Sequence, residues 1–399
     1  MAASDPVPGV HTASAGVRIE DSLAQAMQAW RRDFHRHPEL GHQEHRTAAR
    51  VAELLRSWGI VVHAGYGGTT GVIGVLDGRR GAGPSLGLRA DMDALPMPDG
   101  GAHDHRSVHA GVAHACGHDG HTAILLGAAC HLAAHPDFAG RIVFIFQPAE
   151  EPLTGAKALV EAGLFRDFPC DELYGLHNNN CIGPGRIGVR TGAILSACDL
   201  FEIHIRGVGG HAAMPHQAND PIVAGAALVQ SLQSVVSRNV SPFDTAVLSV
   251  CQFQAGSAIN VIADHAVLRG TVRTLSREAQ SRVLSRLRDL CEGIARGYGC
   301  AIEFRHLLSS PPTINQAGPV AHVKRAAAAV LGTDRIVDPV APLMASEDFA
   351  YLLDDCPGAY FFLGHDGLTC HHPEFDFDDA LLAQGAAIFA TLAYQRLAA

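Results

Sequence analysis

Short, continuously apolar segments alternate with helical segments through the first half of the chain, and this alternation limits the fold more than any other feature. Apolar runs expected to form strands occupy residues 70–78, 85–91, 141–148 and 172–177. The segments expected to be helical are 22–58, 121–135 and 154–164. Strands without polar alternation that are separated by helices indicate a mostly parallel, buried sheet with helices on both faces. We therefore predict an α/β fold.

Apolar and polar residues begin to alternate near Ala197, which predicts a different kind of sheet. Phe201, Ile203 and Ile205 share one side of this segment, as in a strand with one exposed face. The elements expected next are a helix at 221–238, strands at 245–253 and 265–273, a helix at 276–295 and a strand at 301–307. This β-α-β-β-α-β order is that of a ferredoxin-like domain. Helices are expected again at 317–331 and 379–397.

The two patterns divide the chain into three predicted parts. Residues 1–20 are expected to be a flexible tail, residues 21–196 and 309–399 a catalytic α/β domain, and residues 197–308 an inserted ferredoxin-like domain. A length of 399 residues and a hydrophobic content of 47% suit two domains better than one.

The charge balance and the lack of long apolar runs indicate which kinds of binding partner are not expected. Lys and Arg number 30 against 40 Asp and Glu, with no basic block, so a nucleic acid is not expected to bind. No apolar run approaches the ~18 residues of a membrane span, and the first residues lack the pattern of an export signal. The ten cysteines are scattered along a long chain, which favours free thiols and a cytoplasmic location.

Acids and a histidine follow three of the predicted strands. Asp91 and Asp93 stand at the end of one strand, Glu150 and Glu151 after the next, and His177 at the end of a third. The crevice outside the carboxyl ends of parallel strands is where such sheets bind ligands. The two glutamates have an alternative interpretation as an acidic helix start. We favour a division of roles, in which one binds metal and the other moves a proton.

The segment HACGHDGH brings metal-binding side chains to the same region. Cys116 and His118 are two residues apart on a glycine-containing turn, and His121 follows. A thiolate and imidazoles together with a carboxylate suit zinc or a similar metal. The alternative is a capped loop with a structural cysteine. We favour the metal site because the cluster is dense and coincides with acids at the strand ends.

A further acidic and histidine-rich region lies near the C-terminus. Glu347 and Asp348 lie in one segment, and His371 and His372 precede the acidic stretch PEFDFDD. Either histidine has a plain interpretation as a surface residue. Paired histidines beside acids fit a metal site better than a core.

Four segments taken together, HACGHDGH, FQPAEE, GLHN and HHPEFDF, resemble those of a known family. It is the family of metal-dependent amidohydrolases that includes hippurate hydrolases, N-acyl-amino-acid amidohydrolases and indoleacetyl-amino-acid hydrolases, which are relatives of aminoacylases and zinc carboxypeptidases. The segments at 30–44, 89–97 and 207–216 extend the resemblance over about the whole chain beyond the tail. The resemblance implies a zinc-exopeptidase-like fold and hydrolysis of the amide bond of N-acyl amino acids.

The resemblance also implies the parts of the active site. Two divalent metal ions, of zinc, manganese or nickel, are expected on five ligands: Cys116, His118, Glu151, His177 and His371. His371 is chosen over His372 because the family places the ligand two residues before the proline. Glu150 is the implied general base, which takes a proton from water and returns it to the departing nitrogen. Asp91 and Asp93 are expected to support the site.

The inserted domain carries the remaining implied roles, as a lid over the substrate and as the contact of a homodimer or higher homo-oligomer. His211 is expected to stabilise the oxyanion, from its own or a partner subunit. Asn260 and Arg273 are expected to hold the substrate carboxylate. Their alternative interpretations are a turn asparagine and a surface arginine.

Two departures from the family leave the acyl group open. The stretch after the acids at 91 and 93 is unusually rich in histidine, at His103, His105 and His109, and we expect a solvated loop there rather than an adventitious metal site. The segment HNNNCIG (177–183) is more polar than its counterpart in the family. A dipeptidase or carboxypeptidase using the same site, and a non-catalytic binding protein, are the alternative functions.

Overall fold

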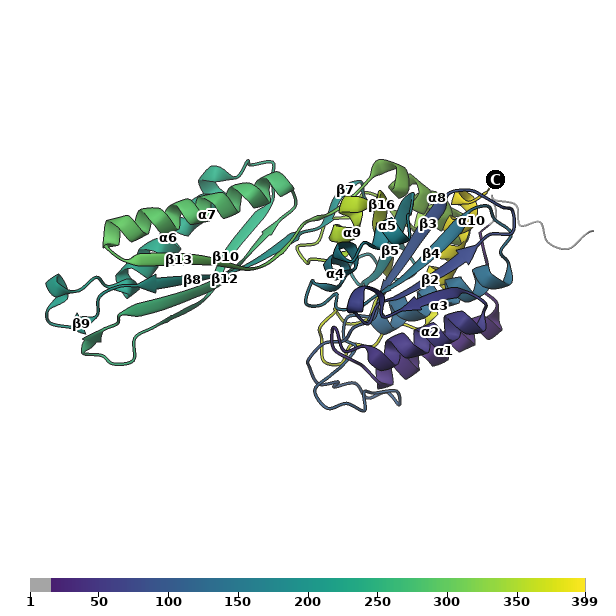
Figure 1. Cartoon of the computed structure of the whole chain (residues 1–399), viewed down its shortest axis with the longest axis horizontal. Coiled ribbons are helices and arrows are strands. Elements are labelled where there is room, and N and C mark those ends of the chain that lie inside the picture. The colour runs from purple at the N-terminus through teal and green to yellow at the C-terminus, as the bar shows by residue number, and fades with distance from the viewer. Residues whose placement is uncertain (1–15, 399) are drawn as a thin grey trace, which may run out of the picture. The chain divides into compact units, whose positions relative to one another are not determined.

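The computed structural model describes residues 16–398, which form two compact units (Figure 1). The first unit contains the described residues up to Gly192, together with Asn315–Val340 and the chain from Tyr351 onward. The second contains Ala193–Ile314 and Ala341–Ala350. Fifteen residues of the predicted tail lie outside the described part. Of the rest of that tail, Val17 and Ile19 are buried in the core.

A mixed sheet forms the centre of the first unit. Within the described residues it has eight strands in the order β1 (Val61–Ala64), β2 (Val72–Asp77), β4 (Arg141–Gln147), β3 (Ser85–Asp91), β5 (Glu172–Asn179), β16 (Gly358–Gly364), β6 (Ile187–Gly188) and β15 (Ile336–Val337). The four central strands, β4, β3, β5 and β16, are parallel. The antiparallel pairs lie on either side of them. The predicted parallel sheet is thus confirmed at the centre, where the carboxyl ends meet at one edge.

Helices lie on both sides of this sheet (Figure 1). They are α1 (Asp21–Arg36), α2 (His45–Ser57), α3 (His118–Ala134), α4 (Gly155–Glu161), α5 (Leu164–Asp167), α8 (Ala317–Leu331) and α10 (Ala380–Arg396), while α9 (Phe349–Asp355) begins in the last residues of the second unit. Helices α3 and α10 pack on each other, and α1 and α8 pack on this pair. The apolar residues of β4, from Ile142 to Phe146, are wholly buried, as expected for a strand covered on both faces.

Two features of the first unit differ from the sequence prediction. The single helix predicted at 22–58 is wrong, because α1 ends at Arg36 and α2 begins at His45. Pro38 disfavours the helical conformation of the residue before it, and Gln43 closes a turn by donating its backbone N–H to the carbonyl of Leu40. The second feature is the group of strands that were not predicted, β16 and the shorter β1, β6 and β15. A short apolar run such as that of β16 does not distinguish a buried strand from a buried helix.

The second unit has the predicted ferredoxin-like succession. Its strands β8 (Ala197–Arg206), β10 (Ala246–Ala255), β12 (His265–Thr274) and β13 (Ala301–Ser310) form an antiparallel sheet in the order β10-β12-β8-β13. Helices α6 (Pro221–Asn239) and α7 (Arg277–Tyr298) lie on one face of it (Figure 1). Phe201, Ile203 and Ile205 are buried beneath them, which confirms the alternation. Shorter strands pair as β9 (Gly210–His211) with β11 (Val261–Ile262) and β7 (Gly192–Leu195) with β14 (Thr313–Asn315).

None of the helices formed by residues 16–398 combines the length and apolar character needed to cross a membrane.

Candidate metal centre

The ends of three neighbouring parallel strands and the start of one helix place the predicted ligands together. Strand β3 ends at Asp91, β4 is followed by the turn that contains Glu150 and Glu151, and His177 lies near the end of β5. Because β4, β3 and β5 are adjacent and parallel, these side chains reach the same edge of the sheet. Helix α3 begins there at His118.

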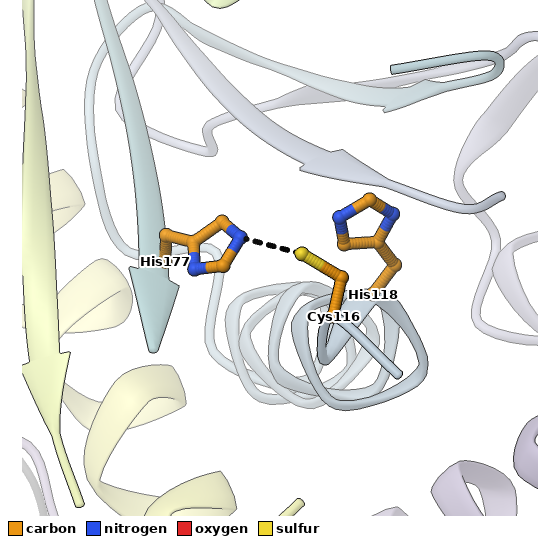
Figure 2. Close-up of side chains that lie close together, drawn as sticks. All are labelled: Cys116, His118 and His177. Carbon is orange, nitrogen blue, oxygen red and sulfur yellow. Dashed lines mark hydrogen bonds between the residues drawn. The ribbon is translucent and has the colours of Figure 1, made fainter. Parts of the chain in front are cut away.

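Cys116, His118 and His177 form the first group of possible metal ligands. Their donor atoms all lie within 4.8 Å of one another. The sulfur of Cys116 is 3.4 Å from Nε2 of His177, and Figure 2 shows it between the two imidazole rings at the start of α3. Gly117 makes this turn possible, because its φ is 106° and a Cβ there would lie 2.1 Å from Oδ1 of Asn178.

Cys116, Glu151 and His371 form a second group with donor atoms within 4.8 Å of one another. Nε2 of His371 is 3.5 Å from Oε2 of Glu151. His371 has a φ of 66°, and its backbone N–H donates to the carbonyl of Ala115, which brings its ring to this edge of the sheet. The structure therefore brings all five predicted ligands together, with Cys116 common to both groups. The ring of His372 instead accepts the backbone N–H of Glu374.

The hydrogen bonds of the two buried rings direct one nitrogen of each into the cluster. Nδ1 of His118 is 2.9 Å from the carbonyl oxygen of Asp93, and Nδ1 of His177 is 2.8 Å from that of Asn178. A carbonyl only accepts, so Nδ1 carries the proton and Nε2 keeps its lone pair. Nε2 of His118 and Oε1 of Glu151 are buried and find no hydrogen-bond partner among the described residues. These are the features of ligands oriented for a metal ion, so the residues present fit one.

Three carboxylate groups surround Nε2 of His118. Carboxylate oxygens of Asp91, Glu150 and Glu151 lie 3.8, 3.8 and 3.9 Å from it. Burial alone would lower the pKa of His118, but the surrounding carboxylates raise this pKa well above its ordinary value. A divalent cation relieves the same excess of negative charge once the histidine has lost its proton.

Asp91 and Asp93 both orient other groups of the site. Asp91 accepts from Arg89 at 2.7 Å and lies 2.7 Å from Nδ1 of His121, and all three residues are buried. The two carboxylate oxygens of Asp93 accept the backbone N–H groups of Glu150 and Glu151, each at 3.0 Å. The carboxylate of Asp93 thereby fixes the turn that presents both glutamates.

Sequence reasoning missed two residues beside the ligands, Asn178 and Cys370. Asn178 donates to the sulfur of Cys370 at 3.4 Å and lies 2.8 Å from Nε2 of His121. The pKa of Cys370 is lowered to about 6, because the Cys116 thiol donates a hydrogen bond to its sulfur and His177 is near. Cys370 thus lies beside both Cys116 and His177. The sequence signal that could have identified Cys370 was its position directly before the predicted ligand His371.

The second unit contains the remaining predicted site residues, which are His211, Asn260 and Arg273, and also the two acids at 347 and 348. His211 is exposed on β9, where its Nδ1 accepts the backbone N–H of Ala213 at 3.1 Å. Asn260 lies just before β11, the strand that pairs with β9. Arg273 on β12 donates to the hydroxyl of Ser346 at 2.5 Å. Glu347 and Asp348 are buried, and Glu347 accepts the backbone N–H of Phe349 at 2.9 Å.

Comparison with known proteins shows relatives that match nearly the whole chain. A hippurate hydrolase of Campylobacter jejuni is 39% identical over 368 residues, which are 92% of this chain and 95% of that protein. An N-acetylcysteine deacetylase of Bacillus subtilis is 39% identical over 365 residues, 91% of this chain and 94% of that protein. Among solved structures, a dinuclear metal-binding peptidase of the M20 family from Bacillus subtilis has a TM-score of 0.83 and 35% identity, covering 95% of this chain and 99% of that one.

The fold, the donor set and these likenesses define a hydrolase of amide bonds that binds divalent metal ions. The model of Peptidase family M20/M25/M40 matches residues 87–395, and the chain belongs to this family. The family resemblance found in the sequence is thereby confirmed, as is the zinc-exopeptidase-like fold.

Proposed function

We propose that this chain hydrolyses the amide bond of N-acyl amino acids at a centre of two divalent ions. The proposed ligands are Cys116, His118, Glu151, His177 and His371. The observation that carries the proposal is the convergence of these donors on Cys116, with one unpaired atom each on His118 and Glu151 within the described structure. The substrate class is supported by the relatives named as a hippurate hydrolase and an N-acetylcysteine deacetylase.

Glu150 is the proposed general base. Its side chain is almost wholly buried, and its carboxylate lies 3.8 Å from Nε2 of His118, beside the proposed ligands. Bound divalent ions supply polarisation of the amide carbonyl and acidification of water. The carboxylate of Glu150 accepts a proton from that water as the water oxygen bonds to the amide carbon, and it delivers this proton to the amide nitrogen as the C–N bond breaks. Asp93 holds the backbone of Glu150, so the base keeps its place beside the donors.

The second unit supplies the proposed substrate contacts. Arg273 and Asn260 are proposed to hold the carboxylate of the amino-acid part, and His211 to stabilise the oxyanion, from its own chain or from a partner in a homodimer or higher oligomer.

The proposed metals are zinc, manganese or nickel, which thiolate, imidazole and carboxylate donors accommodate. A cytoplasmic location is proposed because ten cysteines of the described chain are free thiols.

The test is a panel of substrates with a matched pair of variants. Wild type, Glu150→Ala and Glu161→Ala are assayed on N-benzoylglycine, N-acetyl amino acids and glycylglycine, and the metal content of each protein is measured. Glu161 is the control because it lies on the exposed surface of α4. We expect wild type and Glu161→Ala to release the amino acid from acylated substrates, and Glu150→Ala to lose this activity while retaining its metal. A wild type that carries its full metal complement and cleaves only glycylglycine would overturn the proposal in favour of a dipeptidase. Binding without turnover would indicate a non-catalytic protein.

A further inference from the structure

A second cluster of metal-binding side chains lies at the end of α1, and it contains none of the five ligands proposed above. His35, Asp99 and His103 place donor atoms within 4.8 Å of one another. His103 also belongs to a group with His105 and Asp376, under the same limit. His35 is in the last turn of α1, and the other two residues are in the loop between β3 and α3. The loop that was expected to be solvated therefore turns His103 and His105 inward, while His109 is exposed.

His35 is oriented as a metal-ligating histidine is. Its Nδ1 lies 2.8 Å from a carboxylate oxygen of Asp119, which is wholly buried. Nδ1 donates to this carboxylate, so the free lone pair of a neutral ring is on Nε2. Nε2 is 3.5 Å from Oδ2 of Asp99. It is buried without a hydrogen-bond partner in the described part of the chain.

Asp99 is held in place by the backbone of its own loop. One carboxylate oxygen accepts the N–H of Gly101 at 2.9 Å, and the other accepts the N–H of Ser107 at 2.8 Å. Each carboxylate oxygen has two lone pairs, so both retain one for a further partner. The backbone thus fixes Asp99 with its remaining acceptor capacity toward His35 and His103.

His103 is the least satisfied residue of the cluster. Both ring nitrogens are buried, and neither finds a hydrogen-bond partner among residues 16–398. Its ring stacks on that of His105 with centroids 4.1 Å apart. A Cβ at position 101 would lie 2.4 Å from Nε2 of His103, so a side chain there would displace the ring from this position.

The surroundings of the cluster are negatively charged. Arg31 is wholly buried and contacts the carboxylates of Asp119, Asp376 and Asp379. Arg32 adds one more contact with Asp379, at 2.8 Å. Three carboxylates therefore contact the two guanidinium groups, and the fourth, that of Asp99, lies beside His35 and His103. A divalent cation bound through a neutral His35 replaces the proton of that ring and adds positive charge beside the buried carboxylates of Asp99 and Asp119.

We propose that His35, Asp99 and His103 bind a third divalent cation of the zinc class. Two imidazoles and a carboxylate are a common protein ligand set for such an ion, and His105 stacks against one of the ligands. The ion joins the end of α1 to the loop that connects β3 with α3. The two ends of this loop carry Asp93 and Cys116, so the third ion holds the flanks of the proposed catalytic centre without belonging to it.

The experiment counts ions in matched variants. Wild type, His103→Ala and His109→Ala are stripped with a chelator, reloaded with Zn²⁺ alone, desalted and analysed for zinc per chain. His109 is the control because it is an exposed histidine of the same loop. We expect wild type and His109→Ala to hold one zinc ion per chain more than His103→Ala. Equal zinc in all three proteins would overturn the proposal and leave His35 as a protonated partner of Asp99 and Asp119.

Two further variants separate the third ion from folding and from the catalytic centre. His103→Gln preserves most of the side-chain volume, so a loss of one zinc ion with an unchanged circular dichroism spectrum supports a lost ligand rather than a misfolded loop. His177→Ala removes a proposed catalytic ligand, and adding His103→Ala to it is expected to remove one more zinc ion. If His177→Ala alone abolished the difference that His103→Ala makes, the two clusters would be one site and the proposal would fail.

Discussion

The carboxylate of Asp93 accepts the backbone N–H of Glu151 at 3.0 Å, although 58 residues separate the two along the chain. Its other oxygen accepts the N–H of Glu150, also at 3.0 Å. The carbonyl of the same residue receives Nδ1–H of His118. Asp93 therefore joins the end of β3 to the turn after β4 and to the start of α3. A base, a carboxylate donor and an imidazole donor are all positioned by one residue.

Asp93→Asn is expected to weaken both metal binding and turnover. An asparagine side chain presents an N–H₂ group where one backbone N–H needs an acceptor, and an unsatisfied buried donor costs about 1–3 kcal/mol. Changes to groups that orient metal ligands typically reduce affinity or activity roughly 10–100-fold. Metal affinity from competition with a chelator, measured with kcat on N-benzoylglycine, checks the prediction. Asp77→Asn on the surface is the control. An Asp93→Asn enzyme with wild-type affinity would show that Asp93 is not a positioning residue.

Cys116→Ser is expected to reduce the metal content more than His371→Ala does. The sulfur of Cys116 belongs to both groups of donors, whereas His371 belongs to the second group. Removing His371 is expected to lower the occupancy of one ion, and removing the thiolate to lower that of both. Metal per chain after dialysis against a weak chelator measures the difference. If both variants lost the same amount, the two groups would not share Cys116 as a bridging donor.

The metal-free protein is expected to lose stability between pH 6.5 and 9 because of His35. Burial opposes the charge of His35, but Asp119 and Asp99 raise its pKa from 6.5 to about 9. The protonated ring therefore stabilises the fold fully below pH 6.5, and this contribution is lost as the pH rises through 9. The loss amounts to about 3 kcal/mol, from roughly 1.4 kcal/mol per pKa unit.

Denaturant unfolding in the presence of EDTA, from pH 6 to 9.5, measures this change. The free energy of unfolding of wild type is expected to fall over that range. The free energy of unfolding of His35→Gln is expected to depend less on pH. His109→Gln serves as the control, since its ring is exposed. A wild-type curve that stays level through pH 9 would contradict a raised pKa for His35.

Arg273→Gln is expected to raise KM for N-acyl amino acids with a smaller effect on kcat. A guanidinium that grips a carboxylate through two parallel bonds contributes about 1.5–3 kcal/mol, which corresponds to roughly 10–100-fold in KM. Arg282→Gln, an exposed position of α7, is the control. Substrates in which the carboxylate is replaced by an amide are expected to be insensitive to Arg273→Gln. Equal losses on both kinds of substrate would contradict a carboxylate contact.

The sequence predicted the α/β class and the strand-end positions of the acids because both follow from local pattern. Continuous apolar runs identified β3, β4 and β5, and the polar residues at their ends needed only the rule for parallel sheets. The β-α-β-β-α-β order of the second unit was likewise predicted from local patterns of apolar and polar residues. The family resemblance added the choice of Glu150 as base and of His371 over His372, which spacing alone left open.

The features that were missed depend on contacts between distant segments. The break between α1 and α2 follows from Pro38 and a local turn, yet helical spacing on both sides of it suggested one helix. We expected His103 to be solvated because no local sequence pattern connects it with His35, which lies at the end of α1. β16 was missed because its place between β5 and β6 is fixed by pairing alone.

Gly117 restricts how this centre can be adapted to another metal. A hydrogen atom is all that fits between the turn and Asn178, and the backbone there has a φ that other residues rarely adopt. The relative direction of Cys116 and His118 is therefore a rigid element of the fold. Selection for a metal of different size or preferred geometry has to act through Glu151, His177 and His371, whose supporting segments are separate in the chain.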